Sequence, residues 1–363
     1  MQTISICTVV MNRLFHIRET LLKNIDDSRH MTNIEFVLLD YNSSDGLENW
    51  VRQELSEYIE KGVVKYVRTN EPLYFDRSHS RNLAINVSSG NIIALLDADN
   101  YLGQGYLQWL CNIFDEANKD IIVTTIRKDG AWYGDQAGKC AFFKEKFHQI
   151  RGFDEAMFGY GFEDIDLVNR LDLEGENRVY INEPSYLKFI KHSYYERINN
   201  EFMMKNISAI FSLEPSGDSK NKHVLYLMAD SQYIQVFYSH DPITANSLFY
   251  SYFGYEINNS NVTKGTYLWQ GNQLILQASD NYNTAYLVLD EESETLSSQF
   301  SEVPWSKIEE TMNSYILNIM MYSECWNRFR FRINREKTES VNPNGWGKGN
   351  VFINFSIEPF QIN

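Results

Sequence analysis

Three short apolar runs constrain the fold of this chain more than any other feature of its sequence. They occupy Thr3–Val10, Ile34–Asp40 and Asn91–Asp97. Segments in which apolar residues keep helical spacing, such as Arg13–Asn24 and Leu47–Lys61, separate these runs. Continuous apolar runs that alternate with helices are typical of parallel strands buried on both faces. The sequence therefore predicts an α/β fold whose functional residues lie where the strands end.

The pattern changes in the second half of the chain. Residues 211–223 contain the polar sequence SLEPSGDSKNKH, which is typical of a linker. Beyond it, short apolar segments alternate with turn residues, as around Gly271, where the sequence favours a hairpin. We therefore predict an α/β domain over residues 1–210, a linker over residues 211–223 and a smaller β-rich domain over residues 224–363.

Two segments near the C-terminus alternate between apolar and polar side chains. Because strict alternation is typical of a strand, residues 328–333 and residues 351–357 are both expected to be strands. In the first segment the polar positions are Arg328, Arg330 and Arg332. These side chains would project from one face of a strand, either as a solvated face or as a contact for an anionic acceptor.

Composition excludes some broad classes of function. The 363 residues carry 48 acidic and 33 basic side chains, a net charge of −15, whereas a general nucleic-acid binder needs a basic surface. No apolar run reaches the length of about 18 residues that a membrane span needs, and no secretory signal is recognisable. The four cysteines form no CxxC pair, which argues against a zinc site or a disulfide framework. We expect a cytoplasmic protein.

Acidic residues stand at three places where an expected strand ends or a helix begins. They are Asp40, then Asp97 and Asp99, then Glu163, Asp164 and Asp166. The carboxyl ends of parallel strands meet at one edge of a sheet, so these clusters are expected to share one site. A carboxylate after a buried strand is costly unless it is paired or binds a metal, and oxygen ligands favour Mg²⁺ or Mn²⁺. Asp97 and Asp99 are therefore candidate metal ligands, with the capping of a turn as the alternative.

Four segments, in their order along the chain, resemble the family 2 glycosyltransferases: ISICTVVMNR, EFVLLDYNSSDG, RSHSRNLAINVSSGNIIALLDADN and GFDEAMFGYGFEDIDLVNRL. Enzymes of this family have the GT-A fold, a Rossmann-like fold of nucleotide-diphospho-sugar transferases. The last segment resembles the galactosyltransferase-type C-terminal motif of chondroitin-polymerase-like and β-1,4-galactosyltransferase-like enzymes. The resemblance covers roughly residues 1–200 and implies a GT-A domain there.

The resemblance implies roles for individual residues on the donor side. Thr8 matches a residue of the first strand-end loop, beside the nucleobase, and Asp40 matches an aspartate that hydrogen-bonds uracil. Arg81 matches an arginine that contacts the nucleotide or diphosphate. Asp97 and Asp99 match the metal-binding D-x-D. From the residues alone, Asp40 is alternatively a turn cap and Arg81 a surface ion-pair residue.

On the acceptor side, the resemblance implies that Glu163 and Asp164 lie beside the acceptor, with Asp164 as the catalytic base. His192 falls where many such enzymes have a metal-binding histidine. The alternatives are acids of a first helical turn, which is our expectation for Asp166, and a structural histidine. The sequence departs from the family pattern at Tyr41, where a second aspartate is commoner.

Other aromatic residues bear on which sugar is transferred and on how a sugar ring would bind. Tyr160 and Phe162 replace the Trp and the second Gly of the galactosyltransferase-type motif, which leaves the donor sugar more open than the reaction class. Trp132 and Tyr133 are candidates for stacking on a sugar ring, or for a core or hairpin role.

The chemistry of transfer from a nucleoside diphosphate agrees with these assignments. A cation must neutralise the departing diphosphate, and a carboxylate must take the proton of the acceptor hydroxyl. A single base opposite the leaving group implies in-line displacement with inversion. We therefore expect a metal-dependent inverting glycosyltransferase, with Mn²⁺ or Mg²⁺, that moves galactose or N-acetylgalactosamine from a UDP-sugar to a glycan hydroxyl.

The expected acceptor is a growing surface or capsular polysaccharide, with peripheral contact to a lipid-linked glycan at the inner face of the membrane. Two other classes remain as alternatives. A sugar nucleotidyltransferase usually has a Gly-rich N-terminal loop, whereas TVVMNRLFH contains no glycine. A non-catalytic module that binds glycans or nucleotide sugars would not need intact Asp97, Asp99 and Asp164.

Overall fold

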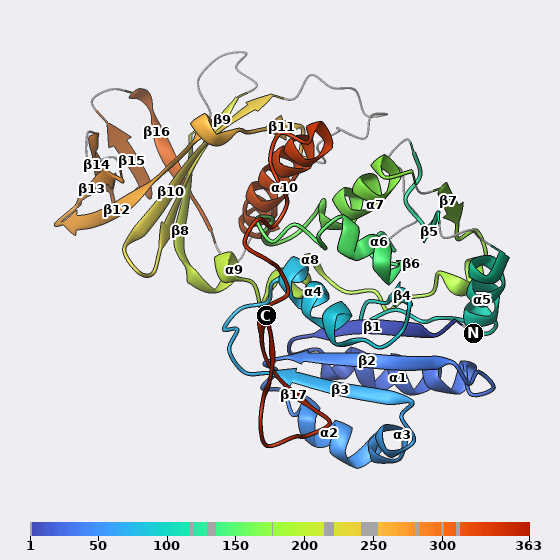
Figure 1. Ribbon diagram of the computed structural model, residues 1–363. Coiled ribbons are helices and arrows are strands. Elements are labelled where there is room, and N and C mark those ends of the chain that lie inside the picture. The colour runs from blue at the N-terminus through green and yellow to red at the C-terminus, as the bar shows by residue number, and fades with distance from the viewer. Residues whose placement is uncertain are drawn as a thin grey trace. The chain divides into compact units, whose positions relative to one another are not determined.

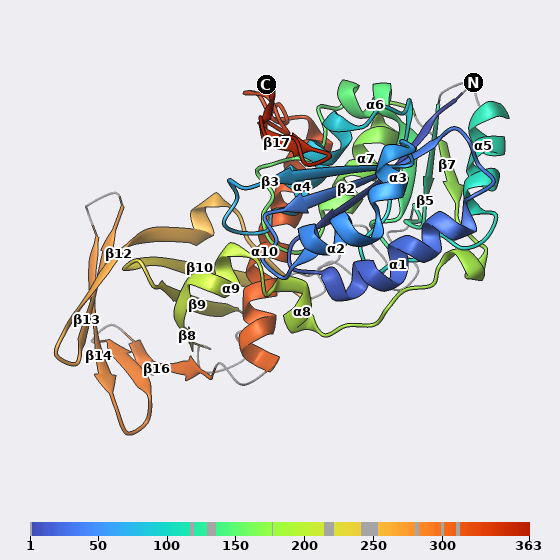
Figure 2. The same cartoon turned by 90° about the horizontal axis from the view of Figure 1, so that it is seen from below.

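The computed structural model shows two compact units along the chain (Figure 1 and Figure 2). It describes residues 2–116, 120–128, 136–175, 177–213, 221–240, 253–279, 283–298, 301–309 and 313–363. Unit 1 comprises Met1–Phe158, Phe162–Ser193 and Phe331–Asn363, and unit 2 comprises Gly159–Gly161 and Tyr194–Arg330. Both the start and the end of the chain therefore belong to unit 1.

Unit 1 contains a nine-stranded sheet with the order β18-β17-β3-β2-β1-β4-β6-β5-β7. Its strands are β1 (Ile4–Val10), β2 (Ile34–Tyr41), β3 (Val64–Thr69), β4 (Ile92–Leu95), β5 (Ile121–Thr124), β6 (Cys140–Phe143), β7 (Asn177–Tyr180), β17 (Gly349–Ile353) and β18 (Phe360–Ile362). Strand β1 pairs in parallel with β2 and β4, and β2 pairs in parallel with β3. Strand β6 is antiparallel to β4 and β5. The three apolar runs form β1, β2 and β4, so the predicted α/β fold is confirmed.

Helices connect these strands. They are α1 (Leu14–Asp27), α2 (Leu47–Glu54), α3 (Ser56–Glu60), α4 (Arg77–Val87), α5 (Tyr106–Glu116), α6 (Lys144–Gln149), α7 (Glu163–Leu173) and the 3-10 helix η1 (Pro184–Tyr186). The helix expected over residues 47–61 is divided in two at the buried Leu55. The other helical segment named from the sequence, residues 13–24, corresponds to α1.

Helices lie on both faces of the sheet because alternate residues of a strand point in opposite directions. Ile6 of β1 belongs to the same buried cluster as Ile17 and Leu21 of α1. The next residue, Cys7, points the other way, and its thiol lies 4.0 Å from the carbonyl oxygen of Ala84 in α4. The strand ends therefore lie between helices of two layers, where a site can form.

The C-terminal segment extends the sheet of unit 1. Strand β17 pairs antiparallel with β3. Next to it, the backbone N–H of Tyr66 donates to Oδ1 of Asn354 at 3.0 Å, and the Asn354 N–H donates to the Tyr66 carbonyl at 2.8 Å. The ring of Phe355 packs on that of Tyr66, with centroids 5.0 Å apart. Residues 331–363 thus belong to unit 1.

The expected strand over residues 328–333 is wrong, because these residues lie inside the helix α10 (Asn313–Glu336). Alternate residues of a helix do not share one face, so the three arginines do not form a row. Arg328 is buried, and its Nη2 donates to the carbonyl of Tyr255 at 2.6 Å. The second alternating segment is a strand only as far as Ile353, because Asn354 has a φ of 47°.

Unit 2 contains a second sheet, of nine strands: β8 (Ile207–Leu213), β9 (Lys222–Met228), β10 (Gln232–His240), β11 (Tyr255–Glu256), β12 (Val262–Gln270), β13 (Gln273–Ala278), β14 (Thr284–Asp290), β15 (Thr295–Ser298) and β16 (Ser301–Ile308). Strand β9 pairs with both β8 and β10, so the sheet closes on itself. Leu225, Leu274 and Leu296 belong to the buried cluster that these strands share. The predicted β-rich character of the C-terminal part is confirmed.

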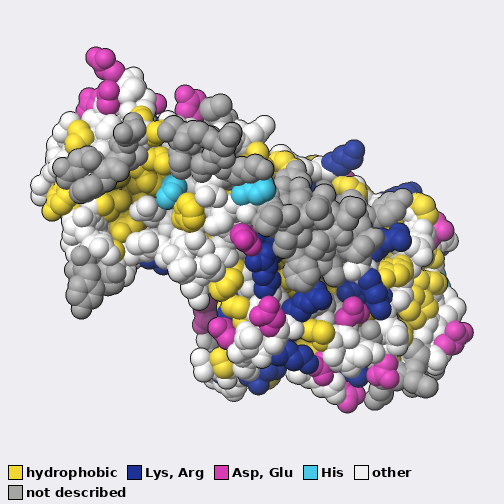
Figure 3. Space-filling model, turned by 90° about the horizontal axis from the view of Figure 1, so that it is seen from above, with side chains coloured by type: hydrophobic (Ala, Val, Ile, Leu, Met, Phe, Trp, Pro, Cys, Tyr) yellow, Lys and Arg dark blue, Asp and Glu magenta, His cyan; other side chains and the backbone are white. Residues whose placement is uncertain are grey.

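Some predicted features lie outside the described residues. The linker predicted over residues 211–223 begins in β8, and residues 214–220 are outside the described part. Trp132 and Tyr133 are outside it as well. Within the part of the chain that the structure describes, no helix is long and apolar enough to cross a membrane. On the face drawn in Figure 3, Lys and Arg side chains are interspersed with Asp and Glu.

The contact between the C-terminal segment and β3 yields a first prediction. An Asn354→Ala substitution should lower the free energy of unfolding by about 1–2 kcal/mol, because the Tyr66 N–H loses its acceptor and alanine tolerates a positive φ poorly. Ile357→Ala is the matched control in the same segment, since the Ile357 side chain is 95% exposed. Urea unfolding measures both. Equal stability of the two variants would mean that β17 contributes nothing to unit 1.

Candidate functional site

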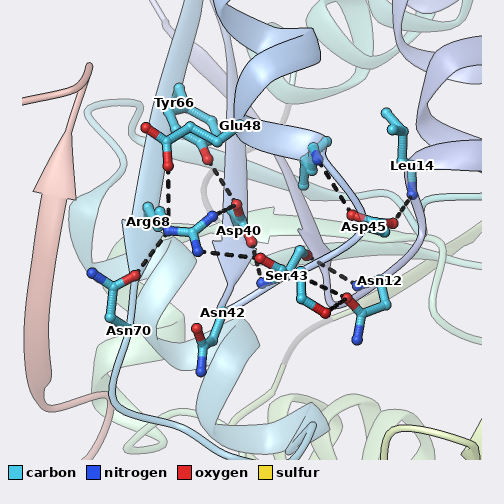
Figure 4. Close-up of polar contacts among 12 residues, drawn as sticks. Asn12, Leu14, Asp40, Asn42, Ser43, Asp45, Glu48, Tyr66, Arg68 and Asn70 are labelled. Atoms are coloured by element: carbon cyan, nitrogen blue, oxygen red, sulfur yellow. Dashed lines mark hydrogen bonds and ion pairs between the residues drawn. The ribbon is translucent and has the colours of Figure 1, made fainter.

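Asp40 stands at the end of β2 with a fully buried side chain. Its Oδ1 accepts from the backbone N–H of Ser43 at 2.7 Å, and its Oδ2 accepts from the Tyr66 hydroxyl at 2.7 Å and from Nη1 of Arg68 at 2.6 Å (Figure 4). Burial and the Asp40 carboxylate raise the pKa of Tyr66. At Arg68, burial alone would lower the pKa, but the Asp40 carboxylate outweighs burial, so the pKa of Arg68 is raised. The Ser43 contact is the turn cap expected from the residues alone. A nucleobase contact stays a prediction.

The loop after Asp40 is held by side chains of two neighbouring loops (Figure 4). Asp45 accepts from the backbone N–H of Leu14 at 2.8 Å and from that of Leu47 at 3.3 Å, so one carboxylate caps both α1 and α2. Oδ1 of Asn12 accepts from the backbone N–H of Ser44 at 2.7 Å. These bonds fix the strand-end loops of β1 and β2 against each other.

Thr8 does not lie in the first strand-end loop, where the resemblance placed it. It is a buried residue inside β1, in register with Leu38 of β2, and the strand continues to Val10. The apolar run VVM after Thr8 favours this longer strand. The loop itself begins after Val10.

The D-x-D segment lies in the loop that follows β4, and helix α1 holds this loop. Oγ1 of Thr20 donates to the carbonyl of Ala98 at 2.7 Å. Asn24 uses both ends of its amide: Nδ2 donates to the carbonyl of Asn100 at 3.1 Å, and Oδ1 accepts from the N–H of Leu102 at 2.8 Å. Because these polar groups of α1 are buried, the loop has little freedom to move.

Asp99 and His192 come together although 93 residues separate them in the chain. The backbone N–H of Ile190 donates to the Asp99 carbonyl at 2.9 Å, and Phe189 forms an antiparallel bridge with Asn100. These contacts bring Nε2 of His192 to 2.9 Å from Oδ2 of Asp99. The predicted pairing of His192 with the D-x-D segment agrees with this geometry.

The chemistry of these side chains suits a hard divalent cation, because carboxylate oxygens and one imidazole nitrogen are ligands of Mn²⁺ and Mg²⁺. Among the described residues, however, no three side chains of His, Cys, Asp or Glu are grouped closely enough to hold a metal ion. Asp99 and His192 form a pair, whereas Oδ1 of Asp97 accepts from Nη2 of Arg81 at 3.1 Å. A third ligand would require Asp97 to turn from Arg81.

Arg81 joins two of the acidic clusters. Its Nη2 donates to Asp97, and its Nη1 donates to Oδ1 of Asp164 at 3.0 Å and to Oε1 of Glu163 at 3.3 Å. The side chain of Arg81 is 8% exposed, and that of Asp97 is 33% exposed. A buried guanidinium that donates to three carboxylates is not a surface ion-pair residue, so that alternative is wrong. Of the three acidic clusters that were expected to share one site, the second and third thus meet at Arg81. Asp40 of the first cluster contacts Ser43, Tyr66 and Arg68 instead.

Local structure explains why these groups meet. Helix α4 begins at the cap Asp76, whose Oδ1 accepts from the His79 N–H at 2.8 Å, and Arg81 lies in the second turn of this helix. Asn82, the next residue, donates to the carbonyl of Phe153 at 3.0 Å and accepts from its N–H at 2.8 Å. Asn82 thereby ties the segment that leads into α7 to helix α4.

The charges at this site are unequal. Burial, together with the carboxylates of Glu163 and Asp97, raises the pKa of Asp164 to about 7, although the Arg81 guanidinium opposes the rise. Burial lowers the pKa of Arg81, but the three carboxylates raise it overall, so the guanidinium stays charged. Burial is thus the largest cause of the raised pKa of Asp164, and its neighbouring carboxylates add to it, whereas the pKa of Arg81 is raised by the carboxylates against the effect of burial.

Asp166 is separate from this group, although it lies two residues from Asp164. It is fully buried, its Oδ2 accepts from Nε of Arg170 at 2.7 Å, and its Oδ1 accepts from Nδ2 of Asn334 at 3.0 Å. The same Asn334 amide donates to Oδ2 of Asp154 at 2.9 Å. Asp166 therefore holds the end of α10 against α7, a structural role of the kind that the sequence favoured.

Two further residues, Gly138 and Lys139, lie close to the site, and no sequence pattern indicated this. Gly138 lies so close to Asp97 that a Cβ at this position would be 2.6 Å from Oδ2 of Asp97. Lys139 is fully buried, and its ammonium donates to the carbonyls of Tyr101, at 2.8 Å, and of Tyr186. Burial lowers the pKa of Lys139 to about 7. In the sequence these residues showed only a failed phosphate-loop pattern, GDQAGK, so only the fold reveals their contacts.

Two models of known protein families match parts of this chain. Residues 5–160 match the model described as glycosyl transferase family 2, and residues 125–196 match the model described as the N-terminal domain of galactosyltransferase. No curated protein matches the chain. The nine-stranded sheet of unit 1, with helices on both faces, is the GT-A fold of glycosyltransferases. Over residues 5–160 the chain is thus similar to glycosyl transferase family 2.

Solved structures with a similar arrangement share little sequence with this chain. A mannosyltransferase from Pyrobaculum calidifontis, in complex with GDP-Man and Mn²⁺, is 19% identical, with a TM-score of 0.43 over 52% of this chain and 57% of that chain. TarS 1–349 of S. aureus, in complex with UDP-GlcNAc, is 16% identical, with a TM-score of 0.43 over 53% and 59%. The chain thus spans less than two thirds of the length of either protein.

A third similar structure comes from an animal enzyme. A mutant of the Drosophila β1,4-galactosyltransferase 7, in complex with manganese, UDP-Gal and xylobiose, is 13% identical. Its TM-score is 0.39 over 55% of this chain and 76% of that chain.

The buried ionic cluster yields a second prediction. An Arg81→Met substitution should lower the free energy of unfolding by about 3 kcal/mol, because it leaves buried carboxylates without their shared counter-ion. Arg52→Met is the matched control, since the Arg52 side chain is 50% exposed and its pair with Glu48 is a surface contact worth about 0–1 kcal/mol. Urea unfolding at pH 7.5 compares them, and a similar small loss in both variants would contradict a buried cluster.

Proposed function

We propose that this protein is a metal-dependent glycosyltransferase that moves a sugar from a UDP-sugar to a glycan hydroxyl with inversion at the anomeric carbon. The observation that carries the proposal is the cluster around Arg81. It brings a carboxylate of the D-x-D loop, Asp97, together with Glu163 and Asp164 at the start of α7. The similarity of residues 5–160 to glycosyl transferase family 2 supports the reaction class.

In this proposal Asp164 is the general base for the acceptor hydroxyl. A base works best when its pKa lies near the working pH, and the pKa of Asp164 is raised to about 7. Arg81 holds Asp164 at 3.0 Å and keeps the carboxylate oriented. Glu163 accepts from the same nitrogen at 3.3 Å and shares the acceptor face in our assignment.

Asp97, Asp99 and His192 are the proposed ligands of a divalent cation, Mn²⁺ or Mg²⁺. Such a cation would neutralise the charge of the departing diphosphate. Asp99 and His192 are already paired, and the partly exposed Asp97 would complete the set by exchanging its contact with Arg81. Arg81 would then be free to donate to a phosphate oxygen, which is the donor-side role that we assign to it.

Thr8 and Asp40 are proposed to act on the nucleobase side. Both side chains are buried, and Asp40 contributes by holding the loop of residues 41–45 through the Ser43 N–H. Galactose or N-acetylgalactosamine is the proposed sugar, in line with the match of residues 125–196 to a galactosyltransferase model. A hydroxyl of a growing surface polysaccharide, lipid-linked at the membrane, is the proposed acceptor.

A donor screen tests the proposal. Purified protein is incubated with UDP-galactose, UDP-N-acetylgalactosamine, UDP-glucose or UDP-N-acetylglucosamine, and released UDP is measured with Mn²⁺ and with EDTA. We expect slow, metal-dependent hydrolysis of one donor, abolished by Asp97→Ala and unchanged by Asp26→Ala, whose side chain is exposed. UDP release that is indifferent to EDTA and to Asp97→Ala would refute the metal site.

The screen also separates the alternative classes. A thermal shift with UDP and Mn²⁺ reports the donor site even when no sugar of the panel is hydrolysed. Stabilisation would keep the transferase proposal and point to another sugar or to a required acceptor. The absence of both hydrolysis and stabilisation would favour a non-catalytic glycan-binding module. Pyrophosphate-dependent formation of UTP from a UDP-sugar would favour a nucleotidyltransferase.

The role of Asp164 yields a further prediction. Asp164→Asn should lower kcat by about 10²–10⁴-fold while UDP binding is retained. Because the base must be ionised and the pKa of Asp164 is about 7, kcat/KM of the wild type should fall about tenfold per pH unit below pH 7 and level off above it. Initial rates from pH 5 to pH 9 measure this limb.

Asp166→Asn is the control for Asp164→Asn. Asp166 is buried two residues further along α7 and contacts Arg170 and Asn334, so its loss should lower stability and leave the pH limb in place. If Asp164→Asn retains full turnover, or if the limb persists in it, Asp164 is not the base.

A further inference from the structure

One outward face of the closed sheet in unit 2 has an unusual composition. The register pairs Leu268 with Ile275 and Ile275 with Tyr286, so these three side chains form a row across β12, β13 and β14. Their neighbours in sequence, such as Leu274 and Leu287, are buried inside the sheet. The row therefore points outward.

Hydroxyl and amide side chains flank this row in the same register. We name the whole set the neutral face: Thr266, Leu268, Gln270, Gln273, Ile275, Gln277, Thr284, Tyr286 and Val288. Three of the four apolar members are well exposed, with 57% for Leu268, 48% for Tyr286 and 45% for Val288, and Ile275 between Leu268 and Tyr286 is half-buried. Contiguous exposed apolar groups rimmed by polar ones mark interaction sites.

Charge is absent from this face. None of its nine members is an acid or a base, although charged residues make up 22% of the sequence and belong mostly on surfaces. Lys264 on β12 and Asp290 on β14 stand just beyond its two ends. A surface that only had to stay soluble would carry charges here, as its borders do.

The polar groups of the neutral face are also unused by the protein. Within the described residues, the amides of Gln270, Gln273 and Gln277 have no hydrogen-bond partner in the chain, and neither do the hydroxyls of Thr266 and Thr284. Strands in register place such groups about 4.8 Å apart across the sheet. Donors and acceptors thus stand in rows on both sides of the apolar row.

We propose that the neutral face binds an uncharged glycan chain. A sugar ring presents an apolar C–H face and a rim of hydroxyls, which match an exposed Tyr286 flanked by amides and hydroxyls. A face without charge suits an uncharged chain, whereas an anionic polymer would meet a protein with a net charge of −15 and no basic group on this face. Protein interfaces are enriched in arginine as well as in aromatic residues, and none of the nine members of the neutral face is an arginine.

This proposal rests on the proposed function, and it narrows the class of acceptor. A transferase that extends a polymer gains from a second contact with the chain, because tethering raises the effective concentration of the acceptor end. The neutral face would supply that contact from residues that take no part in the chemistry. The polymer that it holds would be neutral over the bound stretch.

Affinity electrophoresis of the full chain tests the proposal. Native gels contain dextran, galactomannan or soluble starch, with heparin as the anionic comparison. We expect at least one neutral polysaccharide to retard the wild type, and heparin not to. Tyr286→Ala and Leu268→Ala should weaken this retardation about tenfold in apparent Kd. Tyr195→Ala is the matched control, since Tyr195 of α8 (Tyr194–Ile198) is also 48% exposed in unit 2.

Other outcomes would overturn the proposal. Among them are equal migration of the wild type in all neutral gels, and equal retardation of the wild type and the Tyr286→Ala and Leu268→Ala variants. Sedimentation velocity addresses a second copy as the occupant: a wild-type dimer that Leu268→Ala dissociates would make the face a self-association surface. The thermal shift with UDP and Mn²⁺, run on the same proteins, reports the donor site separately, so failure of the glycan contact and failure of the transferase proposal are distinguishable.

Discussion

The guanidinium of Arg81 donates to carboxylates from two segments that are far apart in sequence, at 3.1 Å to Asp97 and at 3.0 Å and 3.3 Å to Asp164 and Glu163. Buried carboxylates repel one another and lose hydration, so they stay together only if a positive group lies between them. The position of Arg81 in α4 therefore sets where the loop after β4 and the start of α7 can lie. The other contacts of unit 1 refine an arrangement that this ionic cluster imposes.

In the triplet Asp164-Ile165-Asp166, the two aspartates have different partners although they lie in the same helical turn. Two residues apart on a helix, the two carboxylates point about 200° apart around its axis, so they meet different surroundings. Asp164 faces Arg81 and the partly exposed Asp97, whereas Asp166 faces the amide of Asn334, which arrives from the end of α10. The C-terminal segment thereby stabilises the helix that presents the proposed base, without touching the base itself.

The sequence predicted the parts of this structure that local patterns encode. Buried strands, strand-end acids and the pairing of His192 with the D-x-D segment follow from apolar runs and from the family resemblance. It could not predict what depends on partners distant in the chain. Alternation at residues 328–333 indicated a strand, yet helical neighbours on both sides impose the helix α10. The antiparallel pairing of β17 with β3 and the close approach of Gly138 to Asp97 have no local pattern at all.

The carboxylates around Arg81 and His192 bear on how an acidic protein can bind an anionic donor. Asp97, Asp164 and Glu163 share the guanidinium of Arg81, Arg77 lies 3.8 Å from Glu163, and Asp99 is paired with an imidazole. Among the described residues, the carboxylates of this site therefore outnumber its guanidinium groups. Burial, together with repulsion from Glu163 and Asp97, raises the pKa of Asp164 to about 7. A divalent cation would correct the imbalance and give the diphosphate a positive partner in the same step. A site with more carboxylates than positive groups is therefore consistent with metal-dependent donor binding. A bound cation would let a chain with a net charge of −15 bind an anionic donor.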